Sequence, residues 1–286
     1  MSHCPSAEQG VPMAEPSSPG TGAVATMLSG NRDGRWLMAN VLKERYDALV
    51  ATWVALPEER REALLREFVV DYVYNSEKIE NESLEFSVVR DIVEMDQVSG
   101  YSGELDVLVE TRNLKLSWDL ARVKLVEDPC LSEELIQQAQ ELVTMGAYGE
   151  RLLLAGERPG TFKLENYVGG PAQVGLPSVE VPRAVGILAD DVNTELEKGK
   201  RSLTIAAYLH ARLFEIHPFA DGNGRTARLL MNGVLLAMGM PPIVIRAQDH
   251  ATYHAALDLF HLEGDLSPFR RFLRNETLLT WEGLLD

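Results

Sequence analysis

Apolar and polar residues alternate with helical periodicity over most of the chain. Between Glu58 and Tyr74, for example, apolar side chains fall at positions 64, 65, 68, 69, 72 and 73, the spacing of one face of an amphipathic helix. The same pattern predicts helices over residues 36–56, 58–74, 87–96, 102–125, 132–145, 181–197, 202–215, 226–238, 253–261 and 267–280. Between Gly156 and Pro182 the periodicity stops, and Pro, Gly and β-branched residues indicate a hairpin or extended flap. The pattern therefore predicts an all-α bundle with one short β-hairpin.

Composition divides the chain into three parts. Residues 1–34 are rich in Ser, Pro, Gly and Ala, which predicts a disordered tail. Residues 35–100 are expected to form an N-terminal helical region, and residues 101–286 the main catalytic domain. No internal repeat is visible.

Charge and cysteine content exclude some classes of partner. The chain has 286 residues and a formal net charge of −16, which argues against nucleic acid as the main partner. Its two cysteines suggest no disulfide framework, so we expect a reducing, cytoplasmic location. The start of the chain has no cationic segment leading into an apolar core, and the longest uncharged run, 229–245, is too short and broken to span a bilayer. We expect no signal peptide and no membrane contact.

The most informative stretch is residues 216–228, IHPFADGNGRTAR. His217 can accept a proton near neutral pH, and Asp221 is a hard oxygen ligand of the kind that Mg²⁺ prefers. Gly222, Asn223 and Gly224 allow a tight turn, and the helix predicted to follow offers unpaired N–H groups to a phosphate. Arg225 and Arg228 are three residues apart, so they share a helix face. Together these residues predict a polyphosphate site.

This stretch resembles the signature of the Fic family, HPFxxGNGRxxR with an acidic residue before the first Gly, at every position. The resemblance implies a helical bundle that binds Mg²⁺ and ATP and transfers AMP to a hydroxyl group. It further implies that His217 is the base and that Asp221 is the Mg²⁺ ligand. Phosphates would be held by Gly222, Asn223, Gly224, Arg225 and Arg228. An unaltered Gly224 goes with AMP transfer in this family rather than with transfer of a γ-phosphate.

Three further positions carry weaker predictions. Tyr253 is expected to stack on adenine, although an aromatic residue on an amphipathic helix is as often part of the core. Val168, Gly169 and Gly170 are expected to form a flap that aligns a target peptide by strand addition, and an ordinary turn explains them nearly as well. His210 carries no motif support and is expected to be a core histidine. Lys163 stands where the family often has Arg, and no role is predicted for it.

A second pattern lies upstream of the motif. Ser76, Glu80 and Asn81 match the inhibitory pattern of Fic proteins: Ser or Thr, three residues, Glu, then Gly or Asn. A carboxylate beside Arg228 would form a strong pair in the place that the γ-phosphate needs. The default interpretation of Glu80, in a segment rich in glutamate, is a solvated helix face. Together with the motif, the pattern predicts autoinhibition by Ser76 and Glu80.

The expected function is autoinhibited transfer of AMP from ATP to a Ser, Thr or Tyr hydroxyl of a target protein, self-modification included. Two alternatives stay open. One is hydrolytic removal of AMP at the same site, with Glu80 holding the attacking water. The other is a nucleotide-sensing interaction module without turnover. Another nucleotide donor and a homodimer are also compatible with the sequence.

Overall fold

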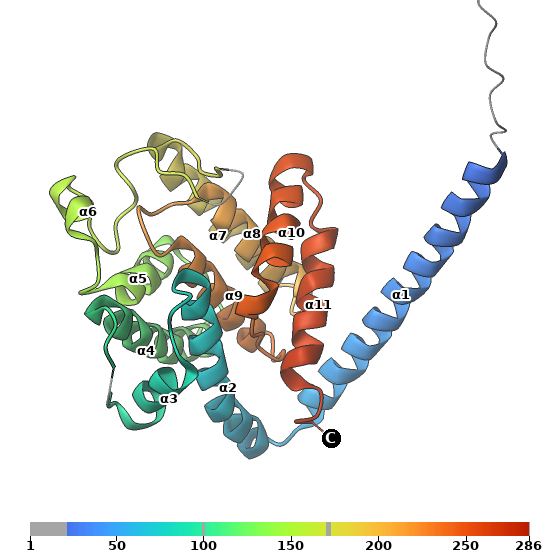
Figure 1. The fold of residues 1–286 in the computed structure, drawn as a ribbon, viewed down its shortest axis with the longest axis horizontal. Coiled ribbons are helices and arrows are strands. Elements are labelled where there is room, and N and C mark those ends of the chain that lie inside the picture. Colours follow the sequence, from blue (N-terminus) through green and yellow to red (C-terminus); the bar gives the residue numbers. More distant parts are fainter. Residues whose placement is uncertain (1–21, 99–100, 170–172, 286) are drawn as a thin grey trace, which may run out of the picture. The chain divides into compact units, whose positions relative to one another are not determined.

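The computed structural model describes residues 22–98, 101–169 and 173–285, and within them it is almost entirely helical (Figure 1). The helices are α1 (Gly22–Ala55), α2 (Glu58–Glu80), α3 (Phe86–Met95), α4 (Leu105–Glu127), α5 (Glu133–Thr144), α6 (Glu150–Leu154), α7 (Val181–Leu196), α8 (Leu203–Ile216), α9 (Asn223–Ala237), α10 (His250–Glu263) and α11 (Ser267–Trp281). Short 3₁₀ turns cover Ser178–Glu180 and Ala247–Asp249. The prediction of an all-α fold is confirmed.

The chain divides into two compact units, residues 1–41 and 42–286. Within the first unit, residues 22–41 belong to α1. Residues 22–34 are thus helical where the sequence predicts a disordered tail, because Ala, Met and Leu in this stretch favour helix over coil. The rest of the predicted tail, residues 1–21, lies outside the described residues. Everything that follows concerns the second unit.

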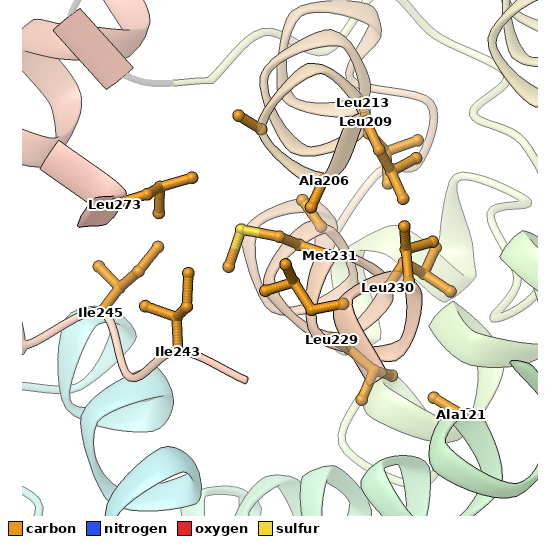
Figure 2. Packing of buried hydrophobic residues seen from close by; sticks show 14 of the residues in the cluster. Ala121, Ala206, Leu209, Leu213, Leu229, Leu230, Met231, Ile243, Ile245 and Leu273 are labelled. Atoms are coloured by element: carbon orange, nitrogen blue, oxygen red, sulfur yellow. The ribbon is translucent and has the colours of Figure 1, made fainter. Parts of the chain in front are cut away.

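Helix α9 forms the centre of the second unit. It packs against α4, α5 and α8, and also contacts α2. Figure 2 shows three consecutive α9 residues, Leu229, Leu230 and Met231, each pointing toward a different neighbour. All three are fully buried. Because nearly every residue of α9 is buried, on all of its faces, other elements must enclose it, so the helix that begins in the 216–228 motif is also the core of the fold.

Aromatic side chains attach α2 to this core. Phe68 lies 5.1 Å from Trp118 of α4 and 5.5 Å from Trp281 of α11, measured between ring centroids, and Trp281 lies 4.7 Å from Trp53 of α1. The indole N–H of Trp281 donates to the carbonyl of Pro242 at 2.7 Å. Such pairs add to the area that aromatic residues bury, so the first half of α2 is firmly held.

α2 and α9, the two helices that carry Glu80 and the motif arginines, are longer than predicted. α2 continues to Glu80, beyond the predicted end at Tyr74, because Ser76 and Glu77 are buried and continue its packed face after the apolar pattern has ended. α9 begins at Asn223 rather than Thr226, because Gly222 takes a positive φ of 77° and lets the helix start directly after it.

The predicted β-hairpin is reduced to one pair of residues. Gly169 and Val174 form an isolated antiparallel bridge, and no strand is present among the described residues. The segment is instead fixed by hydrogen bonds from its two ends to the motif loop, which are described below.

Asn232, on the same helix as the two motif arginines, supports the fold and lies apart from the phosphate motif. Its amide donates to the carbonyl of Ile243 at 3.0 Å and accepts the N–H of Ile243 at 2.7 Å, and the residue is fully buried. We expect Asn232→Ala to lower the free energy of unfolding by about 2 kcal/mol, because a buried backbone N–H loses its partner. Urea denaturation measures this, with Gln138→Ala, an exposed change on α5, as the control. Equal midpoints for the two variants would contradict the prediction.

Candidate active site

His217 directly follows α8 and adopts a backbone conformation that is unusual for a residue other than glycine. It takes a left-handed conformation, φ 50° and ψ 62°, and its N–H donates to the carbonyl of Leu213 at 3.0 Å. This closes the helix end and turns the chain toward Pro218. Positive φ at a bulky residue is uncommon and often marks a functional site.

The turn between His217 and α9 is held by the side chain of Asn223. Its oxygen accepts the N–H of Phe219 at 2.9 Å, and its nitrogen donates to the carbonyl of the same residue at 2.8 Å. The Asn223 side chain thus stabilises the loop, and the N–H groups of the first turn of α9 remain available to an anion. Asp221 accepts the N–H of Gly222 at 2.6 Å. The helix N-cap is therefore Gly222, and Asp221 keeps a second carboxylate oxygen and is 38% exposed.

One pocket of about 350 Å³ brings the predicted residues together. It is lined by Ile79, Glu80, Gly169, Phe214, His217, Ala220, Asp221, Gly222, Asn223, Gly224, Arg225, Arg228, His250, Tyr253 and His254. Two larger hollows in the described part of the chain, of about 410 and 490 Å³, contain no residue of the motif. The predicted base, phosphate turn, two arginines and Glu80 thus share a single cavity.

The imidazole of His217 is closely covered by the flap. A Cβ atom placed on Gly169 would lie 2.3 Å from Cε1 and 2.9 Å from Nδ1 of His217, so only glycine allows this approach. The pKa of His217 is lowered to about 4, first by burial and second by the positive charge of Lys163, while the carboxylate of Glu80 acts against both. His217 is consequently neutral at pH 7, the form that accepts a proton.

Arg228 is almost fully enclosed by α2. Its side chain is 3% exposed, and its guanidinium donates to Ser76 Oγ at 2.9 Å, to the Ser76 carbonyl at 3.0 Å and to Glu80 Oε1 at 2.7 Å. Burial raises the pKa of Glu80, but Arg228 and Arg225 outweigh it and the pKa is lowered. Glu80 is therefore ionised at neutral pH, and the two residues of the upstream pattern both contact Arg228.

Gly224 leaves the space that this contact needs. A Cβ atom at Gly224 would lie 3.0 Å from Nη1 of Arg228 and 3.1 Å from Oε1 of Glu80. Any side chain at this position would press on both partners. The second glycine of the turn is thus adjacent to the Glu80–Arg228 pair as well as to the helix N-terminus.

Arg225 is surrounded by carboxylates that the sequence did not indicate. Its guanidinium lies 2.6 Å from Glu110 of α4 and 3.6 Å each from Glu77 and Asp221. Burial raises the pKa of Glu77 to about 7, with Arg225 acting in the opposite direction. Glu77 shares a helix face with Glu80, three residues on, so its position was inferable. Glu110 depends on how α4 packs, for which the sequence carries no signal.

Tyr253 is nearly fully buried yet lines the pocket, so its stacking on adenine stays a prediction. It is 1% exposed, its ring packs against Phe269 and Phe272, and its hydroxyl is hydrogen-bonded to Nε2 of His210 at 3.0 Å. His210 is fully buried, as predicted.

Two histidines of α10 line the pocket beside Tyr253. His250 and His254 lie one helical turn apart with ring centroids 4.3 Å apart. Their i, i+4 spacing was visible in the sequence, but periodicity alone did not show which side of α10 faces the pocket.

Only one of the three predicted flap residues lines the pocket. Gly169 lines the pocket, Val168 is 51% exposed, and Gly170 lies outside the described residues. The flap approaches the imidazole of His217 through the backbone of Gly169.

The fold and the pocket define an all-α protein in which a histidine at one helix end and a glycine-rich helix start face the same cavity. Residues 130–235 match the Fic/DOC family. The chain is 31% identical over 245 residues to protein adenylyltransferase Fic of Drosophila persimilis, covering 82% of this chain and 44% of that protein. With the protein of the same name from Culex quinquefasciatus it shares 32% identity over 219 residues, covering 74% and 41%.

Solved structures agree on the fold. Fic-1 from C. elegans superposes with a TM-score of 0.74 at 24% identity, covering 93% of this chain and 77% of that one. A Fic domain containing signaling protein from Bacteroides thetaiotaomicron gives 0.67 at 25% identity, covering 86% and 91%. The chain belongs to the Fic family. It spans less than half the length of the two insect relatives.

We expect Gly169→Ala to disturb His217, because the new methyl group would overlap the imidazole. Any reaction that uses His217 as its base should slow by about tenfold or more, since displacing a reacting group by about 1 Å has effects of this size. The rate of the AMP transfer that the motif predicts measures the effect. Gly149→Ala is the matched control, because nothing lies within 4 Å of a Cβ there. Equal rates for the two variants would contradict the prediction.

Proposed function

We propose that this chain is an autoinhibited protein adenylyltransferase that moves AMP from ATP to a Ser, Thr or Tyr hydroxyl of a protein. The observation that carries the proposal is the pocket in which His217, the N-terminus of α9 and the Glu80–Arg228 pair meet. Membership of the Fic family and the shared name of the insect relatives, protein adenylyltransferase, support it.

His217 is the base of the proposed reaction. It takes the proton of the target hydroxyl while the hydroxyl oxygen attacks the α-phosphorus of ATP. The new O–P bond forms as the bond between the α-phosphorus and the bridging oxygen breaks, and pyrophosphate leaves. The neutral imidazole described above has the protonation state that this step requires.

Charge and backbone donors hold the nucleotide. The N–H groups that begin α9 bind phosphate oxygens, and Arg225 and Arg228 supply permanent positive charge with donors suited to those oxygens. Arg225 is already enclosed by Glu77, Glu110 and Asp221, so its share in phosphate binding is more constrained than that of Arg228.

Asp221 is the residue proposed to hold Mg²⁺. Oδ1 of Asp221 accepts the N–H of Gly222, and the side chain is 38% exposed, so its second carboxylate oxygen can reach a ligand. Mg²⁺ is often held by one carboxylate together with substrate phosphates. The bound ion would neutralise phosphate charge.

Glu80 and Ser76 provide the proposed inhibition. They use the donors of Arg228 that a γ-phosphate would need, so ATP competes with a carboxylate already in place. One charge-assisted hydrogen bond contributes about 1.5 kcal/mol, equivalent to about tenfold in affinity. Inhibition is thus a competition between Glu80 and ATP for Arg228, and a substitution that removes the Glu80 carboxylate favours ATP.

The target is a protein in this proposal, and the same chemistry extends to hydroxyl groups of the chain itself.

No helix within the described residues has the length and apolar character needed to cross a membrane.

We expect Glu80→Gly to bind Mg·ATP about tenfold more tightly than wild type and to gain one adenylate or more on incubation. Calorimetry and intact-protein mass spectrometry measure the two effects. The double variant Glu80→Gly, His217→Ala should bind ATP and gain no mass, which separates binding from chemistry. A Glu80→Gly protein that binds Mg·ATP and labels neither itself nor any protein in a cell extract would refute the proposal.

A further inference from the structure

The flap, residues 163–176 without the undescribed 170–172, is attached to the chain on both sides of His217. The N–H of Lys163 donates to the carbonyl of Pro218 at 2.9 Å, and the N–H of Leu176 donates to the carbonyl of Ile216 at 3.1 Å. Both neighbours of the base are therefore hydrogen-bonded to the flap. A displacement of the flap ends would move the backbone that carries His217.

The ammonium group of Lys163 holds the flap from within. It donates to the carbonyl of Tyr167 at 2.8 Å, and it lies 3.3 Å from the position that a Cβ would take on Gly175, in the opposite arm. Tyr167 stands two residues before Gly169, which contacts His217. Gly169 and Val174 exchange two hydrogen bonds of 2.8 Å. The side chain of Lys163 thus links the start of the flap to the Gly169–Val174 bridge, whose Gly169 covers the imidazole.

Lys163 is an unusual residue to bury. It is 2% exposed, and no carboxylate oxygen of the described residues lies within 4.0 Å of its ammonium. Burial lowers its pKa to about 8, with Glu157 acting in the opposite direction. A buried cation without an ion-pair partner is costly, and an apolar side chain of the same length would fill the space without that cost. Its charge therefore calls for an explanation other than stability.

The charge acts on His217. After burial, Lys163 is the larger of the two charged influences on the imidazole, and Glu80 is the other. Further charged or titratable groups that line the same pocket are Asp221, Arg225, Arg228, His250 and His254. A positive charge beside an imidazole disfavours the protonated form. Lys163 thereby favours the form that a base must have before it reacts.

We propose that Lys163 is a positioning residue for His217: it fixes the flap over the imidazole and places a positive charge beside the base. The inference rests on the proposed function only in so far as His217 is the base. It gives a role to a residue for which the motif predicts none, and the role has two parts, a hydrogen bond to the flap and a charge.

The charge is tested by the titration of His217, followed by NMR of the imidazole in wild type, Lys163→Met and Lys163→Arg, with His217→Ala to assign the signal. Loss of the positive charge stabilises the imidazolium, so the midpoint in Lys163→Met should move upward, by about one pH unit. Lys163→Arg keeps the charge and should stay near wild type. If Lys163→Met does not fold, Lys163→Gln removes the charge and keeps a polar end. Equal midpoints for charged and uncharged variants would overturn the proposal.

The consequence for the reaction is tested in the Glu80→Gly background. The acid limb of the pH–rate profile should move upward in Lys163→Met together with the titration midpoint, and Lys163→Arg should restore it. A residue that only stabilised the fold would lower the melting temperature and leave both midpoints unchanged. The titration needs no AMP transfer. A shifted midpoint in a protein that never transfers AMP would thus refute the proposed function and leave the action of Lys163 on His217 supported.

Discussion

The buried guanidinium of Arg228 is the constraint around which this site is arranged. An arginine that is 3% exposed on the central helix has to be paired, because an isolated buried charge is strongly unfavourable. α2 supplies the partners through Ser76 and Glu80. In the proposed function a triphosphate uses the same donors, so whatever satisfies Arg228 in the absence of nucleotide also competes with nucleotide. Inhibition in the proposed function is a direct consequence of burying a phosphate-binding arginine.

The proposed base is arranged by a second set of contacts, made by the flap. His217 lies between two carbonyls that bind the flap and under a glycine that approaches its ring, and the charge of buried Lys163 opposes its protonation. Each of these acts on position or on protonation, and none supplies a strong hydrogen bond to the imidazole. Its Nδ1 has no hydrogen-bond partner among the described residues. The imidazole is thus held by shape and charge and remains free to exchange a proton.

Sequence reasoning reached the parts of this arrangement that local chemistry determines. Helix positions followed from apolar periodicity, and the motif loop followed from the residue types between Ile216 and Arg228. Glu80 was paired with Arg228 only through the family resemblance, because 148 residues separate them and no local rule connects them. The inward face of α10 could not be chosen from its pattern: Tyr253 and His254 are adjacent, and only packing against Phe269 and Phe272 shows which one is core. Glu110 was missed for the same reason, since its role depends on where α4 lies.

In the proposed function, two parts of α2 separate stability from control. The middle of the helix carries Phe68 and Tyr72, which pack against Trp118. Its C-terminal part carries Ser76, Glu77 and Glu80, and Oε1 of Glu77 has no hydrogen-bond partner among the described residues. Apolar packing stabilises in proportion to the area buried, whereas a polar contact loses little when water or phosphate replaces it. The aromatic middle of α2 can therefore keep the helix attached while its polar C-terminal part gives up Arg228, so the end of the helix proposed to inhibit is the end that the fold can most easily release.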